Sequence, residues 1–79
     1  MKNIQNIINA IEAFKSLSYD IMNSTNTVII VIEDFAGFDE NWNEKIVRVD
    51  AAEVAWAESL DGETVEGWHI EVRWASEDI

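Results

Sequence analysis

The clearest pattern in this chain is the alternation of apolar and polar residues from Glu66 to Ala75. Large apolar side chains occupy every second position: Trp68, Ile70, Val72 and Trp74. A period of two is typical of a strand with one face on a core and the other in water. The pattern therefore predicts a strand over residues 66–75, whose apolar face needs a helix and partner strands to cover it.

A spacing of three and four characterises the N-terminal part, where apolar residues recur at Ile4, Ile7, Ile8, Ile11, Phe14 and Leu17. This spacing draws one apolar stripe along a helix. We therefore predict an amphipathic helix from Asn3 to Leu17 that covers one face of the sheet. Residues 18–26 are rich in Ser, Asp, Asn and Thr, a composition that favours local turns, and are interpreted as the connection after the helix.

Residues 27–32 read Thr-Val-Ile-Ile-Val-Ile and are β-branched throughout. A strand that is apolar on both faces is typical of the centre of a sheet. If the first helix covers Val28, Ile30 and Ile32, another element must cover Ile29 and Val31. Two candidates remain open, a second helix and the surface of a second subunit in a homodimer.

The middle of the chain is acidic and aromatic. Residues 33–43 are predicted to form an acidic loop that its own aromatic side chains tuck against the body, and residues 44–49 are predicted to form a second strand. Asp39, Asn41 and Asn43 match the first three ligand positions of a calcium loop, but Glu44 stands where the sharp turn needs glycine. The match is interpreted as accidental, and no metal is predicted.

Residues 51–60 allow two interpretations. Asp50 and Glu53 match a capping box, in which an N-cap side chain and the residue three positions later satisfy each other's backbone donors, and this favours a helix over residues 51–60. The alternative is a hairpin strand, because Val54 and Trp56 alternate with small residues and Asp61-Gly62 is a hairpin-turn dipeptide. Either way, the prediction is one α+β domain over residues 1–79, with an N-terminal amphipathic helix packed on a small antiparallel sheet that includes residues 27–32, 44–49 and 67–75.

The composition limits the cellular compartments in which we expect the protein. The 79 residues include four tryptophans and three phenylalanines, which give a small core a large buried area, and no cysteine. The first residues lack the pattern of a signal peptide, and no apolar run reaches the length of a membrane span. We therefore expect a cytoplasmic protein that needs no cofactor and binds no membrane.

Charge changes this picture most. The chain has sixteen acidic and five basic residues and a formal net charge of −11. Residues 1–32 sum to zero, whereas residues 33–79 hold fourteen acids against Lys45, Arg48 and Arg73, which leaves −11. This imbalance argues against direct binding to nucleic acid and favours a basic partner.

No catalytic signature accompanies the charge. His69 is the one histidine and hence the only candidate base for serine-type catalysis, but its position between two inward tryptophans points it outward. An enzyme is therefore the least favoured class. Trp42 is the best candidate for an interface anchor, although a core role is the commoner one for tryptophan.

The remaining feature is the carboxylate array of residues 33–79: Glu33, Asp34, Asp39, Glu40, Glu44, Asp50, Glu53, Glu58, Asp61, Glu63, Glu66, Glu71, Glu77 and Asp78. Same-face positions of a strand recur about every 6.7 Å, so a small sheet can display carboxylates in rows as a duplex displays phosphates. The predicted partner-binding residues are Asp34, Asp39, Glu40, Trp42, Glu44, Asp61, Glu63 and Glu66.

In its length, predicted α+β fold, lack of a catalytic motif and segregated charge, the whole chain resembles the acidic DNA-mimic inhibitors of bacteriophages, of the anti-CRISPR and anti-restriction type. The resemblance is one of type and assigns no role to individual residues. It implies that the chain occupies the DNA-binding surface of a host defence nuclease or effector complex. Two other classes remain open, an immunity protein against a basic nuclease toxin and a small structural or assembly subunit.

Overall fold

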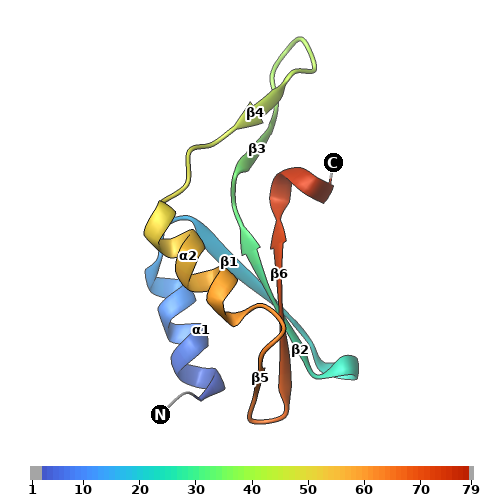
Figure 1. Cartoon of the computed structure of the whole chain (residues 1–79). Helices are drawn as coiled ribbons and strands as arrows, with labels where there is room; N and C mark the ends of the chain where they lie inside the picture. Colours follow the sequence, from blue (N-terminus) through green and yellow to red (C-terminus); the bar gives the residue numbers. More distant parts are fainter. Residues whose placement is uncertain (1–2, 79) are drawn as a thin grey trace.

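The structure is a computed structural model that describes residues 3–78 (Figure 1). Its elements follow one another as α1 (Ile4–Ala13), β1 (Leu17–Met22), η1 (Asn23–Thr25), β2 (Thr27–Ile32), β3 (Phe35–Phe38), β4 (Glu44–Ile46), α2 (Ala51–Leu60), β5 (Thr64–Val65), β6 (Trp68–Trp74) and η2 (Ala75–Asp78). The main sheet has four strands in the order β1-β2-β6-β5, and β3 and β4 form a separate two-stranded ribbon. The α+β prediction is confirmed.

The direction of the central strand pair differs from the prediction. β2 is central, as predicted, and runs antiparallel to β1, but its other neighbour β6 is parallel to it, with Val28 opposite Ile70. The ribbon and α2 together form the long crossover that a parallel pair requires. Residues 44–49 were expected in this sheet, whereas Glu44–Ile46 pairs with β3 instead. The main sheet is therefore mixed, and the ribbon is left outside it.

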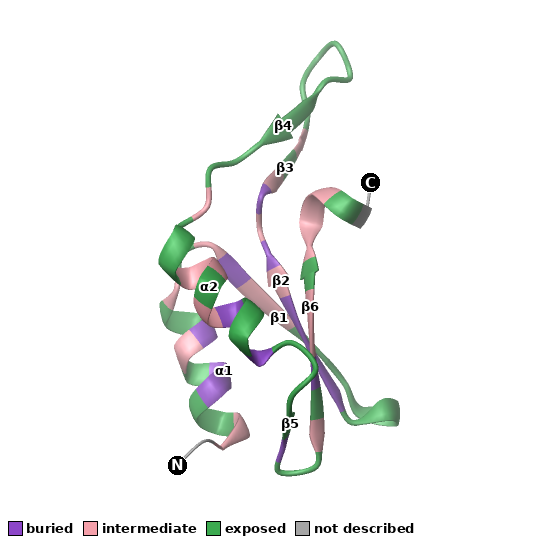
Figure 2. Cartoon of the chain, in the orientation of Figure 1, coloured by how far each residue is buried: buried purple, intermediate pink, exposed green. Residues whose placement is uncertain are grey.

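Both helices pack on the same face of the main sheet. Ile30, Ile32 and Ile70 point from β2 and β6 into one cluster with Ile11 of α1 and Leu60 of α2. The buried positions follow the inner sides of these elements (Figure 2). The apolar stripe of α1 and the alternation of β6 thus meet as their periods predict.

The predicted helix over residues 51–60 is confirmed, but it leaves the second face of the sheet without a helix. On that face Ile29 lies in register between Asp20 of β1 and Glu71 of β6. Its side chain is only 8% exposed within the single chain. Ile29 is therefore buried within the single chain without a helix on that face, contrary to the expectation, whereas Val31 is half-buried.

The first helix is shorter than predicted. It ends at Ala13, Phe14 is already extended, and β1 begins at Leu17. The interpretation of residues 18–26 as a connection is wrong for Ser18–Met22, which belong to the edge strand. Leu17 and Tyr19 face the helices while Ser18 and Asp20 face away, so a period of two was present beneath the polar composition.

The capping box at the start of α2 is half confirmed. Asp50 is the N-cap, and its carboxylate accepts hydrogen bonds from the backbone N–H groups of Ala52 and Glu53. The reciprocal bond is replaced by Ser16, whose hydroxyl accepts the Asp50 N–H at 3.0 Å while its own N–H donates to Glu53 Oε1 at 2.8 Å. Ser16 thereby joins the α1–β1 turn to the beginning of α2.

Candidate functional site

The β3–β4 ribbon projects beyond the main sheet and away from both helices (Figure 1). Phe35–Phe38 forms a strand where an acidic loop was predicted, so that prediction is wrong for this segment. Phe35 pairs with Ile46 and Phe38 with Glu44, which opposes two residues of β3 to one of β4. This is a β-bulge, and Gly37 supplies the positive φ of +92° within it.

The bulge places three aromatic rings along one face of the ribbon. The rings of Phe35 and Phe38 meet edge to face at 5.3 Å, and those of Phe38 and Trp42 lie 6.0 Å apart. Ile46 stands opposite Phe35 on the same face. We call Phe35, Phe38, Trp42 and Ile46 the aromatic strip.

Little of the aromatic strip is covered. Trp42 is 81% exposed, Ile46 61% and Phe38 43%. The tip and β4 are accordingly exposed along their length (Figure 2). A core role for Trp42 and the tucking of this segment against the body are therefore wrong, and the Trp42 side chain is open to solvent.

The tip of the ribbon is built around Asp39. Its carbonyl accepts the Trp42 N–H at 3.0 Å, and its N–H donates to the Asn43 carbonyl at 2.9 Å. Asp39 Oδ1 accepts the N–H groups of Asn41 and Asn43 at 2.8 and 2.9 Å. Trp42 closes the turn in the left-handed region with φ +62°. The tip is thus a three-residue hairpin loop with a tryptophan at the position that normally takes glycine.

Hydrogen bonding also sets the ionisation of Asp39. The backbone N–H of Asn43 and, to a smaller extent, that of Asn41 hold the pKa of the Asp39 carboxyl below its ordinary value, against an opposing effect of desolvation. Asp39 therefore stabilises the tip as a carboxylate, and this contribution is lost as the pH falls through its lowered pKa. The same bonds use the oxygen that a calcium loop would direct at the ion.

Asp34 anchors the base of the ribbon. It is 9% exposed, and its carboxylate accepts hydrogen bonds from both the backbone N–H and the hydroxyl of Ser76 in η2. Its carbonyl accepts the Val47 N–H at 2.8 Å. Asp34 was predicted to contact a partner, but the structure places it inside, where it fixes the ribbon to the end of β6.

The other seven predicted partner-binding residues lie in two separate groups. Asp39, Glu40, Trp42 and Glu44 are together at the ribbon tip, whereas Asp61, Glu63 and Glu66 lie around β5. The ribbon tip and β5 are at opposite ends of the molecule (Figure 1).

Two of the three acids near β5 serve the fold. Asp61 Oδ1 accepts the Val72 N–H at 3.0 Å, and Glu66 Oε1 accepts the Ile4 N–H at 2.7 Å. Glu66 and Gly67 have φ values of +52° and +82°, so they form the two-residue turn of the β5–β6 hairpin. The strand predicted from residue 66 therefore begins at Trp68.

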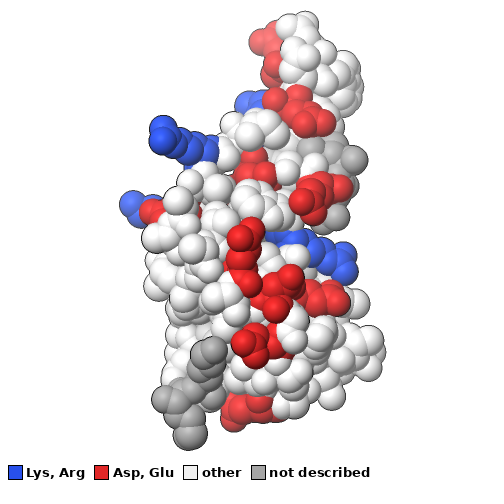
Figure 3. All heavy atoms as spheres, in the orientation of Figure 1, with Lys and Arg blue, Asp and Glu red and all other residues white. Residues whose placement is uncertain are grey.

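Several carboxylates have no role inside the fold. Among the described residues, five exposed acids of the C-terminal part accept no side-chain hydrogen bond and form no ion pair: Glu40, Glu44, Glu58, Glu63 and Glu77. We call these the free acids. Acidic atoms extend from the ribbon tip to the opposite end of the molecule, with basic atoms few and scattered between them (Figure 3).

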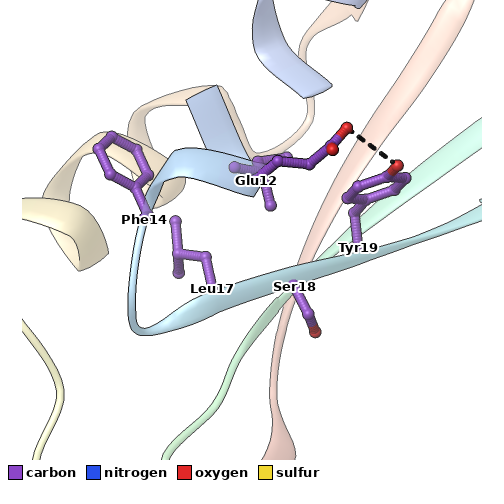
Figure 4. Close-up of a pocket in the computed structure, with 6 residues that line it drawn as sticks. Glu12, Phe14, Leu17, Ser18 and Tyr19 are labelled. Carbon is purple, nitrogen blue, oxygen red and sulfur yellow. Dashed lines mark hydrogen bonds between the residues drawn. The ribbon is translucent and has the colours of Figure 1, made fainter. Parts of the chain in front are cut away.

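A hollow lies beside α1 and β1. Glu12 and Tyr19 face one another across a 3.4 Å hydrogen bond, with Phe14 and Leu17 opposite them (Figure 4). Burial first, and then the charge and hydrogen bond of Glu12, raise the pKa of the Tyr19 phenol. The hollow measures about 230 Å³ and is lined by Ile11 and Ser18 besides these four residues. It is smaller than the usual ligand pocket, so the ribbon remains the candidate site.

No family model, characterised protein or solved structure matches this chain. The two α-helices of residues 3–78 have ten residues each, and no helix of these residues is long or apolar enough to cross a membrane. The same described residues contain no group of three or more His, Asp or Glu side chains that could hold a metal ion. The fold and site together define a small α+β domain that presents an acidic, aromatic β-ribbon.

Proposed function

We propose that this protein is an acidic inhibitor that occupies the nucleic-acid-binding surface of a basic partner protein. The observation that carries the proposal is the distribution of acids along an elongated body. The molecule measures 46 × 28 × 17 Å, and acidic side chains extend over its length (Figure 3). A long, narrow and negatively charged body suits a groove that binds a duplex through lysine and arginine.

The magnitude of the charge defines the kind of mimicry. A net charge of −11 spread over 46 Å is one charge per about 4 Å, compared with one per ~1.7 Å of duplex axis. The protein therefore presents less than half the linear charge density of DNA. Electrostatic attraction supports rapid encounter with a basic groove, but tight binding needs a second contribution.

The finer form of the proposal concerns the partner. The proposed partner is a host defence nuclease or effector complex, which binds DNA in a basic groove. The chain would be the small, non-enzymatic, phage-encoded inhibitor that blocks this groove. The acids that serve the proposal are the free acids, because Asp34, Asp61 and Glu66 are engaged in the fold.

Competition with DNA tests the proposal. The tagged chain is immobilised, and host lysate is passed over it. The retained protein is eluted with a DNA duplex of about 20 base pairs. The eluted protein is identified, and its binding to a fluorescent duplex is measured with increasing amounts of the chain. We expect the chain to displace the duplex. If only high salt elutes protein, or if the eluted protein binds duplex and chain together, the proposal is wrong.

Charge variants sharpen this test. Changing the five free acids to glutamine should slow association with the eluted protein at low salt, whereas changing the same five to aspartate keeps the charge and should preserve the rate. The effect should shrink as the Debye length falls from about 30 Å at 0.01 M to about 8 Å at physiological ionic strength. Equal association rates for the glutamine and aspartate variants would mean that these charges serve solubility alone.

A further inference from the structure

The aromatic strip is not explained by the fold that carries it. Trp42, Ile46 and Phe38 are 81, 61 and 43% exposed. The rings of Phe38 and Trp42 adjoin one another towards the tip, and Ile46 lies opposite Phe35 further along the same face of the ribbon. A contiguous apolar surface with charged residues around it is typical of a contact site. The turn itself does not require tryptophan at position 42, because φ +62° suits glycine or asparagine better.

We infer that the aromatic strip inserts Trp42 into an apolar pocket rimmed by lysine or arginine on the basic partner. This rests on the proposed function and specifies the part of the partner that the ribbon contacts. Tryptophan is the residue type most enriched in the pockets that dominate interface energies. Asp39 and Glu40 precede Trp42 by three and two positions, and Glu44 pairs with Phe38 on the same face of the ribbon, so the surface around such a pocket must be basic.

Charge separates this partner from the other occupants that an apolar strip could take. A second copy would bring a further −11 against the first and would set Asp39, Glu40 and Glu44 against like charges. An anionic lipid surface would repel the same tip. Lys45 does not offset this repulsion, because it alternates with Glu44 and Ile46 along β4 and therefore lies on the opposite face of the ribbon.

The tip is also ordered before it binds. Asp39 accepts two backbone N–H groups, and the Phe38 ring lies 6.0 Å from that of Trp42. A group that is already held in place loses less conformational entropy when it enters a pocket. The base is fixed as well, since the Asp34 carboxylate holds Ser76 of η2.

The two parts of the surface should act on different rate constants. Free acids steer encounter and so govern association, whereas a desolvated aromatic anchor governs dissociation. Since the charge density is lower than that of DNA, residence on the partner depends on the anchor. This division gives the inference a kinetic signature that charge alone does not produce.

The test uses the basic protein that duplex DNA elutes from the immobilised chain, with its binding followed by surface plasmon resonance. Trp42→Gly should speed dissociation by at least about thirty-fold, the size expected of an interface hot spot, and leave association within about two-fold. Met22→Asn is the matched control, because Met22 is apolar, 44% exposed and pairs with Thr27 at the start of β2, whereas the ribbon follows the end of β2. It should change neither rate.

The outcomes separate the inference from the proposed function. If Trp42→Gly leaves dissociation unchanged while the glutamine variant slows association, the inference falls and the proposed function stands. If duplex DNA elutes no protein, both fall.

A photoreactive benzoylphenylalanine in place of Trp42 locates the contact directly. Cross-links to apolar residues beside lysine or arginine of the partner support the inference. Cross-links to a second copy of the chain, or insertion into vesicles of anionic lipid, would overturn it.

Discussion

Replacing Trp42 with glycine is expected to leave the stability of the domain almost unchanged. The substitution removes a side chain that is 81% exposed, so only about a fifth of its surface is in contact with the protein. A tryptophan exposes up to ~250 Å², which makes the lost contact ~50 Å² and its contribution about 1 kcal/mol at ~25 cal/mol/Å².

The backbone term has the opposite sign. Trp42 has φ +62°, a conformation that costs an L-residue roughly 1–2 kcal/mol and glycine nothing. Against this gain, the greater freedom of glycine in the unfolded chain costs about 0.5–1 kcal/mol. The net change in the free energy of unfolding should therefore lie within about 1 kcal/mol of zero.

Urea unfolding followed by far-ultraviolet circular dichroism measures this change without relying on tryptophan fluorescence. Trp74→Ala is the matched control, because Trp74 is half-buried and packs against the core cluster. Its loss should cost at least ~2 kcal/mol. If Trp42→Gly also destabilises the domain by ~2 kcal/mol or more, Trp42 is a structural residue and the argument for an external role is wrong.

Three further predictions follow from the core, the ribbon base and the hollow. Ile30→Ala removes a side chain that is 0% exposed and should cost about 2–5 kcal/mol in urea unfolding; a loss under ~1 kcal/mol would contradict the assigned core. Asp34→Ala should lower the free energy of unfolding more than Ser76→Ala. Asp34→Ala removes both hydrogen bonds from Ser76, whereas Ser76→Ala removes only the one from the hydroxyl, and each bond to a charged group contributes about 1.5–3 kcal/mol. Equal losses in urea unfolding would show that Asp34 does not anchor the ribbon. The pKa of Tyr19 is raised by burial and by Glu12. The neutral phenol therefore stabilises the folded domain below its ordinary pKa of about 10, and this contribution is lost as the pH rises through the raised pKa of the folded state. Glu12→Gln should lower the tyrosinate absorbance midpoint of this sole tyrosine, and an unchanged midpoint would exclude Glu12 as a cause.

The elements with strong periodic patterns could be predicted from the sequence. β2, α2 and β6 lie where the β-branched run, the N-cap and the alternation placed them. These patterns are local, so they survive in the fold whatever surrounds them. The direction of β6 beside β2 is not a local property, because it depends on the path of the crossover between them.

The missed elements are those whose composition hides their conformation. β1 is an edge strand, and the polar residues on its outer face resemble a turn. β3 lies in the segment predicted as a loop and contains Gly37, a residue type common in turns, which here forms part of a bulge. The short β5 has only two residues and offers no period to detect.

The site could be predicted in part. The sequence pointed to the tip residues Asp39, Glu40, Trp42 and Glu44, and the structure brings them together in one hairpin. The sequence could not indicate that Asp34 is buried or that Asp61 accepts a hydrogen bond from the Val72 N–H, because both depend on contacts between residues distant in the chain. The signal that could have located the hairpin was the Asp-Glu-Asn-Trp-Asn run between two apolar segments, which has the length of a three-residue turn and its flanks.

The parallel pairing of β2 with β6 has a consequence for folding. Thr27 pairs with His69, forty-two positions later in the chain, whereas β1 pairs with β2 through a short turn. The local hairpin can form early, but the second edge of β2 stays open until β6 arrives, and such non-local pairing is slow. During that interval the most β-prone segment of the chain, Thr27–Ile32, is available to strands of other molecules. Substitutions that delay the docking of β6 should therefore lower the yield of soluble protein during synthesis more than they lower the stability of the finished fold.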